Sequence, residues 1–336
     1  MTNSSTEQVD YCLLAVVVNR GKAEKVLQLA RKKGLTKANC IFAQGRSAAP
    51  NPFLEWLALG EVDKEVVLLG IKKQDEEEFI SLLDDKLHLC RPHRGIAFTI
   101  PIIYPCGSAG FYKSESPYRC AMIILNEDVA DEFGDFIREK GYAGLTTIKA
   151  KGAASFMHPL MDMKVEPAKA LMLMIVHRNK TDRLIELVTE RFNLNAENTG
   201  VLAVLPINRI TGSILEKERR PGQEKEEELP VMQHMVIATV PHTSAEEYMH
   251  SVKKLGVSGS TIIHSRFIYL LPSTDILLPF HADAEEKMVI TLASRSLARD
   301  IRHQLPLIEF KDQVEKPYAI SLPVIQTQGV REESGG

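Results

Sequence analysis

The sequence lacks long hydrophobic runs and any strong excess of charge of one sign. Its longest apolar stretches, such as 13–18 and 170–176, have the length of strands, whereas a bilayer-spanning helix needs about 18–20 apolar residues. The 336 residues include 41 basic and 44 acidic side chains, which gives a net charge of −3. We therefore expect neither a membrane-inserted protein nor one that binds nucleic acid through overall positive charge.

Cysteine is scarce, and its spacing is uninformative for a disulfide framework or a zinc site. The five cysteines are odd in number and never form Cys-x-x-Cys. Residues 1–10 contain neither a basic region nor an apolar one, so the sequence predicts no export signal. We expect reduced, mostly buried thiols and a cytoplasmic protein. The cysteines are Cys12, Cys40, Cys90, Cys106 and Cys120.

The common signatures of enzymes are also missing. The sequence has no Gly-x-Gly-x-x-Gly, no Gly-Lys-Ser/Thr phosphate loop, no His-Glu-x-x-His and no Gly-x-Ser-x-Gly. Its ten histidines are scattered, without a helical pair four residues apart that has a third ligand in view. The sequence therefore predicts no catalytic residues, no metal site and no bound cofactor.

What the sequence does contain is an internal repeat. Apolar content of 44% and charged content of 25% are typical of a globular chain, and its length favours about two domains, give or take one. Three segments show the same order of signals: an apolar strand, an amphipathic helix ending near glycine, two more strands, a second helix and a last strand that ends in proline. The first strands are Cys12–Val18, Cys120–Leu125 and Met235–Val240.

Helical periodicity supports the order of elements within each segment. Ala23, Val26, Leu27 and Ala30 are spaced to lie on one helix face, and the matching stretches of the other two segments show the same period. Ser244, with Glu247 three residues later, predicts a capping box at the start of a helix in the third segment. The third segment follows a longer spacing, which the charged, Pro-Gly-containing stretch 215–228 explains as a solvated insertion.

The order β-α-β-β-α-β is the split βαβ, or ferredoxin-like, arrangement. Its strands are apolar on both faces, as in 13–18, so the face of each sheet that carries no helices must also be covered. The sequence therefore predicts an α+β fold of three tandem ferredoxin-like repeats, packed about a pseudo-threefold axis as a single-chain pseudo-trimer. The expected boundaries are repeat 1 at 11–103, repeat 2 at 117–212, a charged linker at 213–231, a divergent repeat 3 at 232–325, and flexible tails at 1–10 and 326–336.

This ordered set of signals resembles the PII nitrogen-regulatory signalling proteins, whose ferredoxin-like subunits form trimers. The resemblance rests on the strand 13–19 with the helix after it, Gly34-Leu35, the strand ending at 44–46, and 95–101, and the second and third segments copy most of this skeleton. It covers nearly the whole chain outside the tails and linkers. It implies three divergent PII-like domains fused in one chain, which we expect to be monomeric.

The resemblance also implies a ligand, an adenine nucleotide such as ATP, ADP or AMP, held in clefts between neighbouring repeats. In the family, phosphates bind at the base of a long loop, at the turn before the fourth strand (here 93–95, 198–200 and 316–318) and after that strand. The alternatives are plain turn chemistry for the glycines and solvated charge for the arginines. The candidates that the resemblance implies are Gly45, Arg46, His93, Arg94, Gly95, Lys151, Gly152, Gly200, Arg209 and Arg266.

The long loops after the second strands are where this family contacts its targets, and here they are unusually apolar. Aromatic and methionine side chains are enriched at protein interfaces, although such loops can also fold back onto the body. The resemblance implies a membrane transporter or a metabolic enzyme as the partner, in nitrogen regulation. The candidate partner-binding residues are Phe53, Trp56, Phe156, Met157 and Leu277.

The expectation is thus a non-enzymatic regulator in which a small effector reorders a loop and changes affinity for a partner. One alternative is a scaffold on the same fold that no longer binds an effector, which degenerate clefts would favour. Another is an enzyme on a tandem ferredoxin-like frame, which converging carboxylates or histidines would favour. The last is a metal-binding relative of the copper-tolerance proteins that share the fold.

Overall fold

The helices and strands fall into three consecutive parts of the chain with one order of elements. We call these parts the first segment (residues 11–101), the second segment (118–206) and the third segment (233–324). Each runs strand, helix, strand, strand, helix, strand. The computed structural model describes residues 10–46, 61–104, 111–153, 156–157, 164–165, 167–212, 226–270, 283–308 and 317–330.

The first segment is a four-stranded antiparallel sheet in the order β4-β1-β3-β2. Helix α1 ends at Lys32, and Gly34 follows its C-cap with φ of +77°, the left-handed conformation that glycine adopts without strain. The elements are β1 (Tyr11–Asn19), α1 (Ala23–Lys32), β2 (Lys37–Arg46), β3 (Glu61–Lys72), α3 (Glu76–Leu87) and β4 (Gly95–Pro101), with a 3₁₀ turn at Lys73–Asp75.

The second segment has the matching strand order β11-β6-β10-β7. Two short strands, β8 (Phe156–Met157) and β9 (Lys164–Val165), pair with each other between β7 and β10. The main elements are β6 (Tyr118–Asn126), α4 (Ala130–Glu139), β7 (Leu145–Gly152), β10 (Ala168–His177), α5 (Arg178–Phe192) and β11 (Gly200–Pro206), with a 3₁₀ turn at Glu127–Val129.

The third segment repeats this order as β17-β14-β16-β15. A 3₁₀ turn at His242–Ser244 leads into its first helix, and the Ser244 side chain makes no capping hydrogen bond, so the predicted capping box is wrong. The elements are β14 (Gln233–Pro241), α6 (Ala245–Lys254), β15 (Thr261–Tyr269), β16 (Asp283–Ala293), α7 (Arg295–Gln304) and β17 (Tyr318–Val324), with a 3₁₀ turn at Leu305–Leu307.

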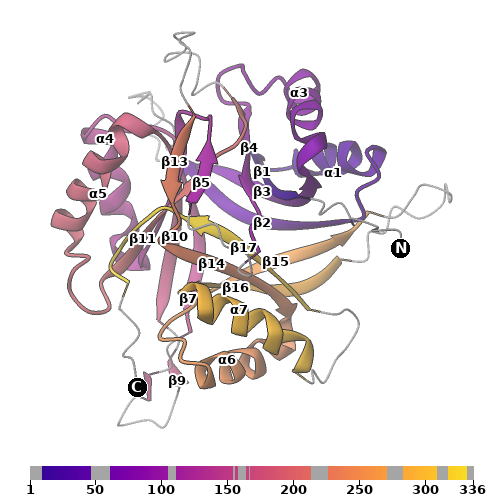
Figure 1. Ribbon diagram of the computed structural model, residues 1–336. Helices are drawn as coiled ribbons and strands as arrows, with labels where there is room; N and C mark the ends of the chain where they lie inside the picture. Colours follow the sequence, from indigo (N-terminus) through magenta and orange to yellow (C-terminus); the bar gives the residue numbers. More distant parts are fainter. Residues whose placement is uncertain are drawn as a thin grey trace.

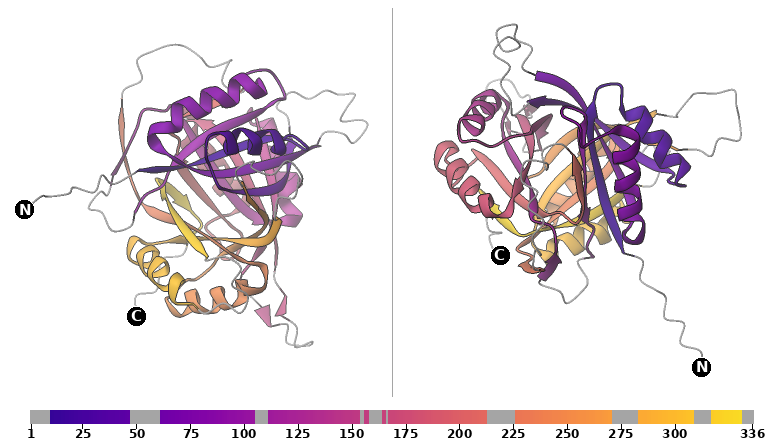
Figure 2. Two further views of the ribbon diagram at one scale, coloured as in Figure 1. Left: turned by 90° about the vertical axis from the view of Figure 1, so that its right-hand side faces the viewer. Right: turned by 90° about the horizontal axis from the view of Figure 1, so that it is seen from above.

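The second strands of the three segments join their sheets in a closed cycle. The end of β2 pairs with the start of β7, the end of β7 with the start of β15, and the end of β15 with the start of β2. The result is a mixed α/β protein with one large antiparallel sheet of 14 strands. Figures 1 and 2 show its helices on the outside and its strands towards the middle of the molecule.

The core has an inner part and three outer parts, which explains why the strands do not alternate. In β1, Leu13, Ala15 and Val17 face an inner cluster to which all three segments contribute. Leu14 and Val16 face the other way, against helices α1 and α3. The helices of the second and third segments cover two corresponding outer clusters. As the sequence predicts, both faces of the strands are therefore buried.

The segments also exchange short edge strands. Strand β12 (Ile210–Gly212) pairs with β4 of the first segment, and β18 (Gln326–Gln328) pairs with β11 of the second segment. At the third junction, the Ile103 amide donates a hydrogen bond to the Ser321 carbonyl. The backbone groups at the open edge of each sheet thereby gain partners. The predicted C-terminal tail consequently starts too early, because residues 326–328 form a strand.

The two connections between segments pair with each other. Strand β5 (Phe111–Ser114) lies before the second segment, and β13 (Glu227–Pro230) lies before the third. The predicted charged linker, 213–231, therefore includes a strand at its C-terminal end. Its remaining residues up to 225 lie outside the described residues.

Candidate functional site

A cavity with a mainly apolar lining lies between the first and third segments. Its volume is about 470 Å³. The first segment contributes β1, the turn after α1, the start of β2, and β3; the third contributes β14, β16 and the start of β17. The lining residues are Leu13, Gly34, Leu35, Thr36, Lys37, Ala38, Asn39, Leu68, Gly70, Ile102, Ile237, Thr239, Met288, Pro317, Tyr318 and Ile320.

The turn after α1 is held against the third segment by main-chain bonds. Gly34 and Leu35 donate to carbonyls of the last helical turn, which fixes the direction of the chain at the cavity rim. The Leu270 amide of the third segment then donates to the Thr36 carbonyl at 2.8 Å. This bond extends the pairing of β15 with β2, so one wall of the cavity is connected directly to residue 270.

Two residues of the cavity lining, Asn39 and Tyr318, belong to a polar group of side chains that also includes Glu286. The Tyr318 hydroxyl donates to the Asn39 side-chain oxygen at 2.6 Å, and the Asn39 amide donates to Glu286 at 3.5 Å. Asn39 and Glu286 are only 4% and 7% exposed. Because Asn39 belongs to the first segment and the other two to the third, this group also connects the two segments.

The rest of the lining is mainly aliphatic and nearly uncharged. Of the lining residues that the structure describes, Lys37 alone has a charged side chain, and its ammonium lies 5.5 Å from the centroid of the Phe267 ring. Among the residues that the structure describes, no arginine reaches the cavity. An apolar wall with a few fixed polar groups is suited to a flat ring that makes hydrogen bonds at one edge.

Arg46, predicted as a phosphate ligand, instead connects the first two segments. Its guanidinium donates to the Asp131 carbonyl at 3.1 Å, pairs with the Asp131 carboxylate and lies 3.6 Å from Asp135. It packs against Gly134 of α4, where a Cβ atom would lie 2.4 Å from the guanidinium. The space beside Arg46 amounts to about 20 Å³, too little for a nucleotide.

Gly45 lies beneath a partly buried lysine. A Cβ atom at Gly45 would lie 2.6 Å from Cε of Lys64, whose ammonium donates to the Asn19 side-chain oxygen. Burial lowers the pKa of Lys64. The second segment repeats this arrangement with Lys169, which donates to Asn126 and has a pKa that burial also lowers. Gly152, the counterpart of Gly45, packs against Pro167.

Gly95 and Gly200 have clear structural roles. Gly95 has φ of +138°, and a Cβ atom there would lie 2.3 Å from the Val17 carbonyl oxygen. At Gly200 the corresponding distance to the Ile124 carbonyl oxygen is 2.6 Å. His93, with φ of +64°, accepts a hydrogen bond from Asn19 at its carbonyl. These contacts favour the alternative of turn and close-packing chemistry for the glycines.

The remaining predicted cations lie at junctions or on the surface. Arg209 donates its amide to the Thr99 hydroxyl at 3.1 Å and lies 3.9 Å from Glu77, connecting the second segment to the first. The Arg266 guanidinium stacks 4.8 Å from the Phe42 ring centroid. Arg94 and Lys151 are exposed. None of the ten predicted residues lines the large cavity, and their role in nucleotide binding stays a prediction.

Some residues of the cavity lining were identified from the sequence, and others were not. The turn before the fourth strand of the third segment was matched to a ligand-binding turn of the PII family, and Pro317 and Tyr318 of that turn do line the cavity. Asn39 of the lining was missed because it is a single polar residue between Ala38 and Cys40, and its partner Glu286 was missed within the charged run 285–287. The loop candidates Phe53, Trp56 and Leu277 lie outside the described residues, as do the side chains of Phe156 and Met157.

A second, more polar opening of about 500 Å³ lies between the second segment and the end of the third. It is bordered by the turn 194–198 and by residues 327–330. The Gln328 amide donates to the Asn195 side-chain oxygen at 2.5 Å across this junction. All three junctions between segments thus differ: one is filled by Arg46 and its partners on α4, one holds an apolar cavity, and one is a polar groove.

The described residues offer little for catalysis or metal binding. They contain no group of three His, Cys, Asp or Glu side chains placed to hold a metal ion. Burial raises the pKa of the Cys120 thiol to about 12, and burial together with Glu76 raises that of Cys12 to about 12. Neither thiol is therefore ionised as a nucleophile near neutral pH. None of the described helices is long and apolar enough to cross a bilayer.

Comparison with known proteins identifies no family. No protein-family description matches the chain, and no curated protein matches it. Among solved structures, aspartate kinase from Synechocystis aligns with 93% of this chain and 43% of its own, at 12% identity and a TM-score of 0.22. The chain thus spans less than half of that enzyme's length, and a likeness this low supports no conclusion about fold or function.

Proposed function

We propose that the three segments are tandem ferredoxin-like repeats packed as a single-chain pseudo-trimer. Their shared order of elements and shared order of strands support this proposal. The cyclic pairing of β2, β7 and β15 adds to it, because each strand uses its end to pair with the start of the next. The exchange of edge strands at the junctions follows the same cyclic order.

On this frame the chain acts as a PII-like regulatory protein that binds a small effector and has no catalytic activity of its own. The observation that carries this proposal is the cavity of about 470 Å³ between the first and third segments. It lies between neighbouring repeats and includes the turn before a fourth strand, the type of position at which the resemblance expects an effector. A ligand there would contact both segments at once.

The lining favours an effector with an apolar ring, such as the adenine of a nucleotide. Leu13, Leu68 and Ile237 offer apolar contact, while Asn39 and Tyr318 offer hydrogen bonds at one end. Lys37 alone is charged among the described residues of the lining. In this proposal the ring therefore supplies most of the binding free energy, and the phosphates supply little.

The effector would act on a partner through the long loop that follows β15. The Leu270 amide, immediately before this loop, donates to the Thr36 carbonyl in the cavity wall. A ligand that binds one arrangement of this wall more tightly than another shifts the population of wall arrangements, and with it the affinity for a partner. By resemblance, that partner is a membrane transporter or a metabolic enzyme in nitrogen regulation.

Calorimetric titration of the full chain tests the proposed effector. ATP, ADP, AMP and adenosine would each be titrated, the nucleotides with and without magnesium. We expect one main site per chain and affinities that differ by less than about tenfold along this series, because the lining has so little positive charge. The absence of heat with every compound would contradict effector binding and favour the scaffold interpretation.

A further inference from the structure

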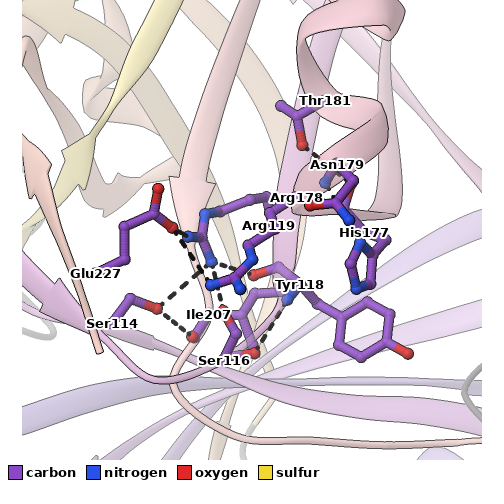
Figure 3. Close-up of polar contacts among 10 residues, drawn as sticks. All are labelled: Ser114, Ser116, Tyr118, Arg119, His177, Arg178, Asn179, Thr181, Ile207 and Glu227. Carbon is purple, nitrogen blue, oxygen red and sulfur yellow. Dashed lines mark hydrogen bonds and ion pairs between the residues drawn. The ribbon is translucent and has the colours of Figure 1, made fainter. Parts of the chain in front are cut away.

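At strand β13, the connection before the third segment lies against the start of the second segment. Strand β13 pairs over four residues with β5, from Glu227 opposite Ser114 to Pro230 opposite Phe111. The ion pairs of Lys113 with Glu226 and Glu228, at 3.8 and 4.0 Å, lie on the exposed side of this ribbon. Glu227, between those two acids, points the other way, towards the body of the protein (Figure 3).

Glu227 meets a buried arginine. The side chain of Arg119 is only 3% exposed, although it stands at the start of β6. One guanidinium nitrogen donates to the carbonyls of Ser116 at 2.6 Å and Tyr118 at 3.0 Å. The other donates to the Glu227 carboxylate at 2.6 Å. The main-chain oxygens orient the guanidinium, and Glu227 supplies a carboxylate that pairs with it.

A second arginine approaches the same carboxylate. Arg178 is the first residue of helix α5, and its guanidinium lies 3.8 Å from Glu227. The carboxylate thus lies between two guanidinium groups, both from the second segment, while its side chain remains 44% exposed (Figure 3). Two arginines whose positions are fixed by β6 and α5 form a geometry that suits an oxyanion.

The two arginines form an anion site of the second segment, and the carboxylate that occupies it comes from outside that segment. A buried guanidinium is costly without a counter-charge, so the site favours an occupant of negative charge. The carboxylate that fills it comes from a connection attached by four paired residues, by Leu229 in the outer cluster of the second segment, and by exposed ion pairs, which contribute little each. Since Glu227 is partly exposed, a solvent anion can reach the arginines as Glu227 leaves them.

We propose that Arg119 and Arg178 form a binding site for an oxyanion, a carboxylate or a phosphate group, and that Glu227 is its internal occupant. A free anion then competes with Glu227, and its binding releases β13 from β5. The connection before the third segment is consequently held in place by a contact that a ligand can replace.

The first test removes the internal occupant from the full chain. Glu227→Ala and the milder Glu227→Gln would be compared with Glu228→Ala, which removes an exposed acid from the same strand. Thermal unfolding would be followed with increasing inorganic phosphate or acetate, against sodium chloride at equal ionic strength. We expect a saturable gain in Tm of about 2–4 °C in the Glu227 variants at about ten times the dissociation constant.

The two anions distinguish the sources of the oxyanion. Stabilisation by phosphate alone indicates a phosphate site, and stabilisation by both indicates a site for oxyanions in general; either supports the proposal. Adding Arg178→Gln to Glu227→Gln is expected to abolish the gain. The proposal is overturned if the Glu227 variants gain no more from either anion than Glu228→Ala does, or if Arg178→Gln leaves the gain intact.

Competition is tested in the unchanged protein by hydrogen exchange. We expect the amides of 227–229 to exchange at least severalfold faster in saturating phosphate or acetate than in chloride, while the amides of β6 remain protected. Unchanged exchange at 227–229, at an anion concentration that saturates Glu227→Gln, would overturn the release of the strand.

Discussion

At the scale of single residues, burial determines how the thiols respond to pH. The pKa of Cys120 is raised from 9.0 to about 12 by desolvation, whereas in the unfolded chain the thiol ionises near 9. Between these values the folded state binds one more proton, so this thiol makes the free energy of unfolding fall as pH rises from 9 towards 12. The slope is about 1.4 kcal/mol per pH unit.

We therefore predict that Cys120→Ala reduces the loss of stability above pH 9. Denaturant unfolding of both proteins at pH 8, 9, 10 and 11 measures the difference between their slopes. Below pH 9 the difference in unfolding free energy between the two proteins should be constant. Parallel pH profiles up to pH 11 would show that Cys120 ionises as readily in the folded state as in the unfolded chain.

Glu65 caps the N-terminus of α1 in place of Lys22, the residue before the helix. The Lys22 side chain makes no capping bond, and the buried Glu65 carboxylate instead accepts the amides of Gly21 at 2.9 Å and Ala23 at 3.0 Å. We predict that Glu65→Ala lowers the free energy of unfolding by about 2–3 kcal/mol, through two lost bonds to a charged acceptor. Glu24→Ala, at an exposed acid in the same helical turn, should cost less than half as much in the same denaturant titration.

The contacts of several single residues could not be predicted from the sequence. Gly95 and Gly200 were predicted from a ligand-binding turn, yet a neighbouring strand carbonyl lies too near for a Cβ atom at either position. Arg46 was predicted from the base of a loop, but its partners Asp131 and Asp135 lie far along the chain. A sequence gives residue type and local position, while the partners of a long side chain depend on how distant segments pack.

At the scale of elements, the C-terminal strand β18 is predicted to stabilise the molecule. It pairs with β11, and the Gln326 side chain also donates to Asp182 at 2.8 Å. Ending the chain after Ile325 should lower the free energy of unfolding by about 1–3 kcal/mol, because these hydrogen bonds are lost. A chain that ends after Val330 retains β18 and serves as the control. Equal midpoints for the two truncated chains in urea would contradict a stabilising β18.

The main elements were predictable because they carry strong periodic patterns, as α1 does with Val26, Leu27 and Ala30 on its buried face. The short strands were not. Strands β12, β13 and β18 are each three or four residues long and have little pattern of their own. Strands β12 and β18 form against an open sheet edge, and β13 pairs with the equally short β5 of the other connection. These partners come together only after the segments have assembled.

At the scale of the whole molecule, the cyclic pairing predicts a single cooperative unit. Leu13, Ile148 and Ile263 share one inner cluster although they come from three segments, so no segment can bury its inner face alone. We predict one calorimetric transition with equal calorimetric and van't Hoff enthalpies. Leu83→Ala leaves a cavity at a fully buried position on the inner face of α3, and it should lower the temperature of this whole transition.

Two comparisons test this cooperativity. Tyr142→Phe changes a half-buried side chain of the second segment, and it should leave the temperature of the single transition nearly unchanged. Residues 10–104 expressed alone should show no cooperative unfolding, because their inner face would be exposed. Separate transitions, of which Leu83→Ala moves only one, would instead indicate independent domains.

The central claim, that the cavity between the first and third segments is the effector site, is tested most directly by filling it. Gly70 lines the cavity in β3, and a Cβ atom there would meet nothing within 4 Å, so Gly70→Leu adds a side chain at an open position of the lining. Gly259→Leu, at an equally open glycine outside the cavity, is the control. In calorimetric titration with ATP, we predict at least about tenfold weaker binding for Gly70→Leu and unchanged binding for Gly259→Leu. Equal affinity in both variants, or no binding by the unchanged protein, would contradict the claim.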